Sequence, residues 1–280
     1  MVLKEAATGG ADRKPQSLPD SQERWLPLSD EEREALVSSY FEGYVDAGSH
    51  PISYALRHPA ESVRAFRTLL RLPLVTAALT RTPGGRDIWI GLAHGRRSVI
   101  RTPVHALASL LKLPGRPEEY ALGRHRQTLR RKCRAAEKRG VRWALVVDDA
   151  ERERLADLAN ERDRTHPRDE FRVLDGDNRR LLVHPLWLAA YAADGRPILV
   201  SITPTDGEWA LLQYFRTLEE SPEASDARYL VTRVLAEELI RRGVRYLADN
   251  SSPMGIGNGL RQYQRMLGFR IFRIRRRWLR

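Results

Sequence analysis

The chain has 280 residues, 42% hydrophobic and 30% charged, so it can bury a substantial core as one large unit or two smaller ones. Its single cysteine, Cys133, excludes an intrachain disulfide and a thiolate metal cluster, which fits a reducing compartment. No apolar run approaches the roughly 20 residues of a membrane span, and the N-terminus lacks the apolar core of a signal peptide. We therefore expect a cytoplasmic protein.

The balance of charge is strongly basic. A net charge of +12 and a pI near 10.3 favour a polyanionic partner such as nucleic acid, or an anionic substrate. A basic surface with no such partner is the alternative. Residues 1–24 are rich in Gly, Pro, Ser, Asp and Lys and lack apolar periodicity, so we expect a mobile tail there.

Two helices are expected after the tail. Residues 29–32 read as a capping box, and apolar residues at helical spacing follow it, which predicts a helix over about residues 30–46. A second helix is expected over residues 60–70. Its apolar positions, which we expect to face the core, are Val63, Phe66, Leu69 and Leu70.

The next segment is expected to be a hairpin followed by a helix. Residues 88–93 and 98–100 are apolar runs on either side of His94 and Gly95, which indicates two paired strands. Thr102 and Pro103 resemble a helix start with Pro at the first position. Residues 114–117 end that helix and mark a boundary between an N-terminal portion, 25–117, and a main domain, 118–280.

Residues 124–139 are the most basic interior segment, with eight Arg or Lys residues against one acid, Glu137. Leu122, Leu129, Cys133 and Ala136 lie at helical spacing, so the segment predicts an amphipathic helix with an outward basic strip. Such a strip could follow phosphates; a solvated basic face is the alternative. The phosphate-binding candidates here are Arg126, Arg130, Arg131, Arg134 and Lys138.

From Arg142 the pattern becomes strongly ordered. Strands are expected at 142–147, 186–191, 197–203, 209–215, 244–248 and 269–277, with Asp194 and Gly195 as a hairpin turn. Helices are expected from Asp148 or Asp149 to 163, from Ser225 or Asp226 to 242, and in a short stretch that ends at Gly268. The residues between 164 and 185 are expected to be helical or irregular.

A glycine-rich turn connects the strand ending near Asp249 to the last helix. Gly255, Gly257 and Gly259 alternate in it, and glycine lets backbone amides approach a ligand without a Cβ in the way. A merely flexible turn is the alternative.

The order of elements from Arg142 resembles the acetyltransferase fold of the GNAT superfamily. Three local motifs resemble its FemAB-type branch, which contains peptidoglycan-bridge aminoacyltransferases and related antibiotic-pathway enzymes. The motifs are the Arg-rich segment 128–141 before the first strand, the helix-to-strand step 227–247, and the closing motif 259–269. Gln264 departs from the family's usual Lys, so Arg261 or Arg265 would have to supply that charge.

The resemblance covers residues 120–280 and implies an α/β (α+β) fold around a mixed, mainly antiparallel sheet. Residues 25–117 would be a helical portion or a reduced, divergent first copy of that fold. The resemblance also implies transfer of an acyl or aminoacyl group from a carrier to an amine, possible in antibiotic or cell-wall peptide synthesis, with formation of an amide bond.

Such a transfer needs a positioned carbonyl, an oxyanion site and one proton acceptor. Asp249 at its strand end is the first candidate acceptor, with a turn or cap role as the alternative; Glu208 and Tyr214 are further candidates. No metal site is expected. The expected substrate-binding residues are Asn250, Ser251, Gly255, Gly257, Gly259, Tyr263 and Gln264.

The donor is the open question. An acyl-coenzyme A enzyme of this fold typically binds pyrophosphate at a glycine-rich turn before the helix after the fourth strand, but residues 218–226 here are acidic and contain no glycine. The basic helix and the arginine-rich end instead suit a tRNA acceptor stem. We expect aminoacyl-tRNA as co-substrate and no other cofactor; acyl-CoA and a non-catalytic nucleic-acid binder are the alternatives. Further phosphate-binding candidates are Arg261, Arg265, Arg275, Arg276 and Arg277.

Overall fold

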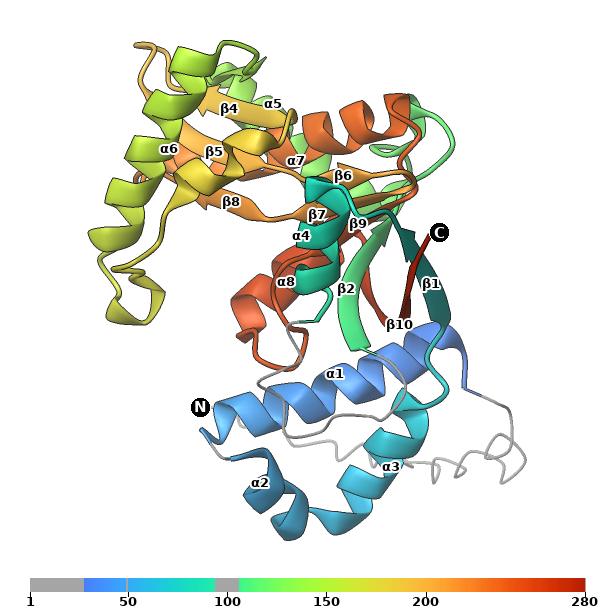
Figure 1. Ribbon diagram of the computed structural model, residues 1–280. Helices are drawn as coiled ribbons and strands as arrows, with labels where there is room; N and C mark the ends of the chain where they lie inside the picture. The colour runs from blue at the N-terminus through green and yellow to red at the C-terminus, as the bar shows by residue number, and fades with distance from the viewer. Residues whose placement is uncertain (1–27, 49, 94–105, 280) are drawn as a thin grey trace, which may run out of the picture.

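A computed structural model describes residues 28–48, 50–93 and 106–279 (Figure 1). The N-terminal elements are α1 (Asp30–Asp46), α2 (Pro51–Arg57), α3 (Pro59–Leu69), β1 (Leu74–Leu79), α4 (Pro83–Gly91) and β2 (Ala106–Lys112). Then follow η3 (Pro117–Glu119), η4 (Arg124–Arg126), α5 (Gln127–Lys138), β3 (Arg142–Leu145), α6 (Asp149–Arg164), η5 (Asp169–Phe171) and η6 (Asn178–Val183). The rest are β4 (Trp187–Tyr191), β5 (Pro197–Ile202), β6 (Thr205–Asp206), β7 (Trp209–Leu212), β8 (Tyr214–Thr217), α7 (Pro222–Arg241), β9 (Tyr246–Asp249), α8 (Asn258–Leu267) and β10 (Phe269–Trp278).

The strands form two sheets that are linked through one chain segment. One sheet has the order β1-β10-β2-β9-β7-β6 and the other β3-β4-β5-β8, and only Gln213 separates β7 from β8. The pairs β1–β10 and β7–β9 are parallel, and the remaining pairs are antiparallel. The expected α/β fold with a mixed, mainly antiparallel sheet is confirmed. The order of elements from Arg142 is also as expected, except that the strand expected at 209–215 is divided into β7 and β8 in different sheets and the short β6 precedes it.

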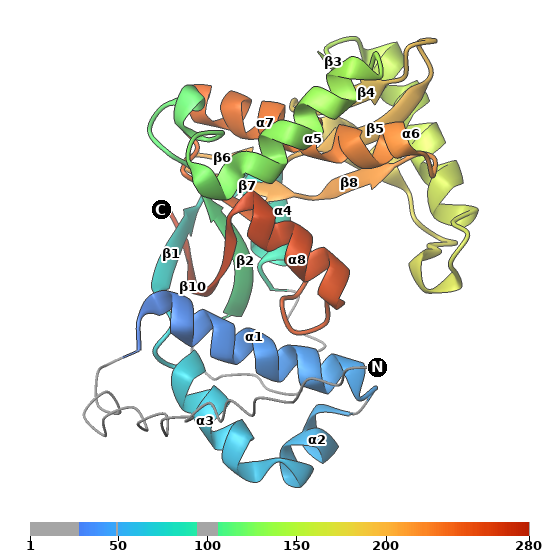
Figure 2. The same cartoon turned by 180° about the vertical axis from the view of Figure 1, so that it is seen from behind.

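Helices cover both faces of this strand layer. α6 and α4 lie on the face seen in Figure 1, and α5, α7 and α8 lie on the face seen in Figure 2. The largest buried cluster fills the space between the strands and α5, α7 and α8, because α7 turns its apolar stripe, including Leu230, Leu235 and Leu239, onto the sheet. α1 and α3 pack under one end of the six-stranded sheet, where Val37, Phe41 and Leu69 meet Ile271.

Local helix signals are confirmed at several ends. Ser29 and Glu32 form the expected capping box of α1. Gly268 ends α8 in the left-handed region with φ 85°, and a Cβ there would also collide with the guanidinium of Arg126. The cap expected at Ser225 or Asp226 is wrong: Ser221 caps α7 and Pro222 occupies its first position.

The expectation of a strand at residues 88–93 is also wrong, since residues 88–91 complete α4 and residues 92–93 form the turn after it. Thr82 accepts a hydrogen bond from the Gly85 amide, and Pro83 follows it, so the helix starts before the apolar run. The second strand, the turn and the helix start at Thr102 lie outside the described residues. Residues 106–112, expected to be helical, form β2 because they fill the position between β9 and β10.

The second helix forms, but its expected core face is mostly wrong. α3 packs on α1 through Ala65, Thr68 and Leu69. Val63, Phe66 and Leu70 are exposed, because the stripe they form points away from α1. The proposed tail, residues 1–24, lies outside the described residues.

Residues 114–117 join β2 to η3, and elements from both sides of this connection share the six-stranded sheet. No helix within the described ranges combines the length and apolar content needed to cross a bilayer.

Candidate active site

The candidate active site lies where two parallel neighbours separate. β7 runs beside β9 from Trp209 opposite Tyr246 to Leu212 opposite Asp249. Beyond that point β8 pairs with β5 alone, while β9 ends at Asp249 and the chain turns towards α8. The strands therefore part at Asp249. In Figure 2, β7 and β8 lie between α7 and α8.

A bulge at Gln213 produces this separation. Leu212 packs in the cluster under α7, whereas Tyr214 packs in the cluster under α6, although residues two apart in a regular strand share a face. Gln213 is thus an extra residue that turns the strand, as β-bulges do. Its carbonyl accepts a hydrogen bond from Asn250 Nδ2 at 3.3 Å, while Asn250 Oδ1 is buried and has no hydrogen-bond partner among the described residues.

The free edge of β8 offers backbone groups to the opening. The Leu218 amide bonds the Ile198 carbonyl at 2.9 Å, and Arg216 lies opposite Val200, so the even-numbered residues point to β5. By antiparallel alternation, the amide and carbonyl of Phe215 point away from β5, towards the opening. A ligand lying there could therefore bond this edge as an added strand does.

Asp249 lies at the opening with one firm hydrogen bond, from the Ser251 amide to Oδ1 at 2.7 Å. Burial raises the pKa of its carboxyl group, and the Ser251 amide and hydroxyl, the Gln264 side chain and the charge of Arg228 oppose that rise. A carboxylate with a raised pKa is a better proton acceptor than an ordinary aspartate.

Aromatic and cationic side chains from α7 and α8 lie on the same face. The Arg228 guanidinium stacks on the Tyr263 ring at 4.4 Å, and Tyr229 meets Tyr263 edge-on at 5.1 Å. The Tyr263 hydroxyl donates to the Arg228 carbonyl at 3.2 Å and lies 3.1 Å from Thr232 Oγ1. Burial raises the pKa of Tyr263 to about 12. The phenol therefore stays protonated, and Tyr263 lines the site and does not act as a proton acceptor.

The glycine-rich turn does not need its glycines for its own conformation. Gly255, Gly257 and Gly259 have no positive φ, and a Cβ at each would meet nothing within 4 Å. Gly257 also begins α8 without a side-chain cap, so the amides of the first turn have no capping side chain. Open space beside uncapped amides at a helix N-terminus suits an oxyanion or phosphate.

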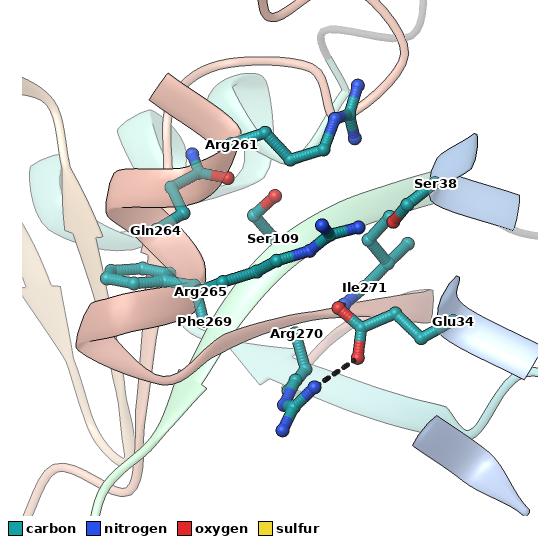
Figure 3. A pocket seen from close by; sticks show the side chains of 9 residues that line it. All are labelled: Glu34, Ser38, Ser109, Arg261, Gln264, Arg265, Phe269, Arg270 and Ile271. Atoms are coloured by element: carbon teal, nitrogen blue, oxygen red, sulfur yellow. Dashed lines mark hydrogen bonds and ion pairs between the residues drawn. The ribbon is translucent and has the colours of Figure 1, made fainter. Parts of the chain in front are cut away.

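A shallow hollow of about 10 Å³, open to solvent, lies between α8, α1, β2 and β10 (Figure 3). Arg261 and Gln264 point into it beside Ser109, and Arg265 extends across it. Arg261 Nε and Gln264 Nε2 are buried without hydrogen-bond partners. Arg261 is 3% exposed and 3.3 Å from Glu42, and burial lowers its pKa, so it is part of the α1–α8 interface rather than a surface phosphate ligand.

Two expected proton acceptors lie apart from Asp249. Glu208 is exposed in the turn before β7 and pairs with Arg245 at 3.0 Å. Tyr214 is buried under α6, where its hydroxyl lies 3.3 Å from both the Ala159 carbonyl and Asp163. Burial raises its pKa strongly. In the described part of the chain, His, Cys, Asp and Glu residues do not gather in threes that could hold a metal ion.

The basic strip of α5 divides into internal and exposed cations. Arg126 is buried, donates to the Met266 carbonyl at 2.9 Å and stacks on Tyr120. Arg130 donates to the carbonyls of Ala121 and Gly123 at 2.6 and 2.8 Å. Both are held by the fold, so only the remaining three candidates, Arg131, Arg134 and Lys138, stand exposed.

The arginines of β10 divide in the same way. Arg276 lies over the Trp89 ring at 4.7 Å and donates to the Trp89 carbonyl, whereas Arg275 and Arg277 are exposed. Of the remaining expected site residues, Arg265 is exposed and 3.5 Å from Glu42. The sequence analysis did not identify Gln213 and Arg228 as residues of the site. The signal available in the sequence was that each is a polar residue flanked by apolar ones.

Comparisons with known proteins add the following. No family model and no curated protein matches the chain. It is similar to solved structures of L-PGS from Bacillus licheniformis (13% identity, TM-score 0.44, 62% of this chain and 63% of that one) and of a conserved protein of unknown function from Bacteroides thetaiotaomicron (12%, 0.44, 64% and 64%). A third is the C-terminal domain of a protein described as a lysylphosphatidylglycerol synthetase from Agrobacterium fabrum (10%, 0.45, 71% and 75%). The matches span less than two thirds of the first two chains.

Proposed function

We propose that the protein is an acyltransferase that moves an aminoacyl group from aminoacyl-tRNA to an amine acceptor, with Asp249 as proton acceptor. The observation that carries the proposal is the opening at Asp249, where β7 stops pairing with β9 and the chain continues as β8 beside β5. It combines a carboxylate of raised pKa with the unpaired backbone edge of β8.

In this reaction the amine nitrogen attacks the ester carbonyl and the bond from that carbon to the ribose oxygen breaks. The amine proton passes to the Asp249 carboxylate and is returned to the leaving oxygen. Backbone amides at the β8 edge or the start of α8 would stabilise the oxyanion. The Arg228–Tyr263 wall would hold the acceptor or the aminoacyl side chain.

The surroundings of α7 argue against acyl-CoA as the donor. The first turn of α7 is capped by its own Ser221, whose hydroxyl accepts from the Ala224 amide at 3.1 Å. Glu219, Glu220 and Glu223 lie within two residues of this cap. The nearby cations Arg196 and Arg162 already pair with Glu219 and Glu220, so they are not free to bind a diphosphate. The exposed cations of α5 and β10 instead suit the backbone of a tRNA, which carries many more phosphate groups than coenzyme A.

The test is transfer from a pool of radiolabelled aminoacyl-tRNAs, run beside labelled acyl-CoAs, with an amine mixture as acceptor. Loss of label from tRNA, blocked by micromolar deacylated tRNA but not by coenzyme A, supports the proposal. The opposite pattern of inhibition would make the protein an acyl-CoA enzyme. Tight tRNA binding without any transfer would make it a nucleic-acid binder.

A further inference from the structure

An exposed apolar surface covers the hairpin of α2 and α3, at the end of the molecule away from β3, β4 and β5 (Figure 1). Six of the eighteen exposed large hydrophobic residues in the described part of the chain lie within residues 52–74. Five of them, on the two helices and the residue after α3, are between 44% and 77% exposed: Ile52, Leu56, Val63, Phe66 and Leu70. Such a concentration marks an interaction surface, whereas single exposed hydrophobic residues do not.

The apolar residues of α3 form one stripe beside a stripe of arginines. At 3.6 residues per turn, Val63, Phe66 and Leu70 fall within about 60° of one another. The adjacent sector of the helix, also about 60° wide, contains Arg64, Arg67 and Arg71. Beyond it lies the buried face, with Ala65, Thr68 and Leu69. The helix therefore has three faces: core, exposed apolar and exposed basic.

The charge that the hairpin itself carries is almost entirely positive. Residues 51–74 contain four arginines and one acid, Glu61, which lies 3.7 Å from His58. Within the described ranges, no carboxylate pairs with Arg64, Arg67 or Arg71. The arginines are thus available to an anionic partner next to the apolar stripe.

We propose that the α2–α3 hairpin docks the protein on an anionic lipid surface. Arg64, Arg67 and Arg71 would contact the headgroups, and the exposed apolar stripe would insert at the boundary of the acyl chains, the arrangement of interfacial amphipathic helices. α2 and α3 form the end of the molecule opposite β3, β4 and β5 (Figure 2), so an extended surface such as a bilayer can reach them. This inference is independent of the proposed transferase activity.

The test uses the full chain and sedimentation with vesicles of phosphatidylcholine, with and without about one third phosphatidylglycerol. Binding is expected only to the anionic vesicles and should weaken as salt rises. Leu56→Asp with Phe66→Asp should lower the partition coefficient at least about tenfold, and Arg64→Glu with Arg67→Glu should do the same. These side chains are exposed, so circular dichroism should show an unchanged fold.

Matched controls lie elsewhere on the surface. Val147→Asp with Leu174→Asp changes two apolar residues that are 79% and 71% exposed, and Arg168→Glu with Arg180→Glu changes two exposed arginines. Both control pairs should bind vesicles as the unaltered chain does. Since Cys133 is buried, a fluorophore on Leu56→Cys can be placed selectively and should shift to the blue with anionic vesicles.

The proposal is overturned if the unaltered chain does not bind anionic vesicles, or if the hairpin and control pairs reduce binding equally. It is also overturned if sedimentation equilibrium shows a dimer that Phe66→Asp dissociates, because a second copy would then cover the surface.

Discussion

Asp249 is the residue on which the proposed chemistry depends. Burial raises the pKa of its carboxyl group, and the Ser251 amide at 2.7 Å fixes its orientation. A carboxylate with a raised pKa accepts a proton well, but its buried negative charge lowers the stability of the folded protein. Both consequences can be measured.

Asp249→Asn keeps the shape and an acceptor oxygen for the Ser251 amide, so the fold should persist. Turnover should fall by roughly 10²-fold or more, the scale of a positioned base. The unaltered enzyme should lose kcat/KM as pH falls through a pKa above the ordinary 3.8, and the variant's residual activity should lack that dependence. Glu208→Gln, at an exposed ion pair, should change neither. Equal kcat in Asp249→Asn would remove Asp249 from the mechanism.

Asp249→Asn should raise the stability of the folded chain at pH 7 although it lowers turnover. The pKa of Asp249 is higher in the folded than in the unfolded chain, so the folded state binds more protons between the two values. The contribution of Asp249 to stability is therefore most favourable below the unfolded pKa and declines as pH rises through the folded pKa. At pH 7 the Tm of Asp249→Asn should exceed that of the unaltered chain, and the gap should close below pH 3.8. A lower Tm at pH 7 would contradict this.

Two glycines near the site should behave differently. Gly257 has φ −69° and open space around it, so Gly257→Ala should change stability by less than about 0.5 kcal/mol while weakening donor binding. Gly268 has φ 85° and faces Arg126, so Gly268→Ala should cost at least about 1–2 kcal/mol. Urea unfolding and donor titration would separate the two effects. Unchanged donor binding in Gly257→Ala would leave the turn with no ligand role.

At the scale of elements, α5 and the residues that cap its two ends carry two kinds of cation. Arg126 and Arg130 satisfy backbone carbonyls of neighbouring segments. Lys132 and Arg139 pair with the buried Asp226 of α7 and so join α5 to α7. Arg131, Arg134 and Lys138 are exposed, and the one bond that they make within the described part of the chain is from Arg134 to the Arg130 carbonyl of the same helix, at 3.4 Å.

We predict the effect of replacing Arg131, Arg134 and Lys138 together by Gln on the salt dependence of tRNA binding. The slope of the logarithm of the binding constant against the logarithm of the salt concentration should become less steep by two to three, at about 0.9 per phosphate contact. The free energy of unfolding should be nearly unchanged. Arg126→Met should do the reverse, because it leaves the Met266 carbonyl without its donor, at a cost of about 1–3 kcal/mol. Filter binding of deacylated tRNA at several salt concentrations measures this slope for each variant. A slope unaffected by the triple change would move the tRNA surface away from α5.

At the scale of the whole molecule, β2 determines how the halves of the chain fit together. It comes from residues 106–112 yet lies between β9 and β10, with Leu110 opposite Ala248 on one side and Arg270 on the other. Both neighbours come from the last 35 residues of the chain. The candidate site at the end of β9 is therefore supported by the N-terminal part of the chain.

Residues 114–280 expressed alone should aggregate or unfold without cooperativity, since removing β2 leaves β9 and β10 with unpaired edges. Coexpression with residues 1–113 should restore a soluble complex. Within the full chain, Leu110→Asp should abolish the folded state, whereas Lys112→Asp, exposed on the same strand, should leave it intact. A soluble, cooperatively folded 114–280 fragment would show that the C-terminal part is autonomous.

The sequence by itself determined the features that depend on near neighbours in the chain. The capping box at Ser29 and Glu32, the left-handed stop at Gly268 and the hairpin turn at Gly195 follow from residues within a few positions of one another. The order of elements from Arg142 is likewise a property of apolar period and turn residues. The position of Asp249 at a strand end belongs to the same class.

Tertiary structure decided what depends on distant partners. Residues 106–112 are a strand because two distant strands flank them, and Arg126 is internal because the end of α8 offers it a carbonyl. The bulge at Gln213, which opens the site, is visible only as a change in which helix Leu212 and Tyr214 face. Val63, Phe66 and Leu70 have a core-like period, but α1 occupies the other side of their helix. A one-dimensional pattern records that a face is apolar, and only packing decides what covers it.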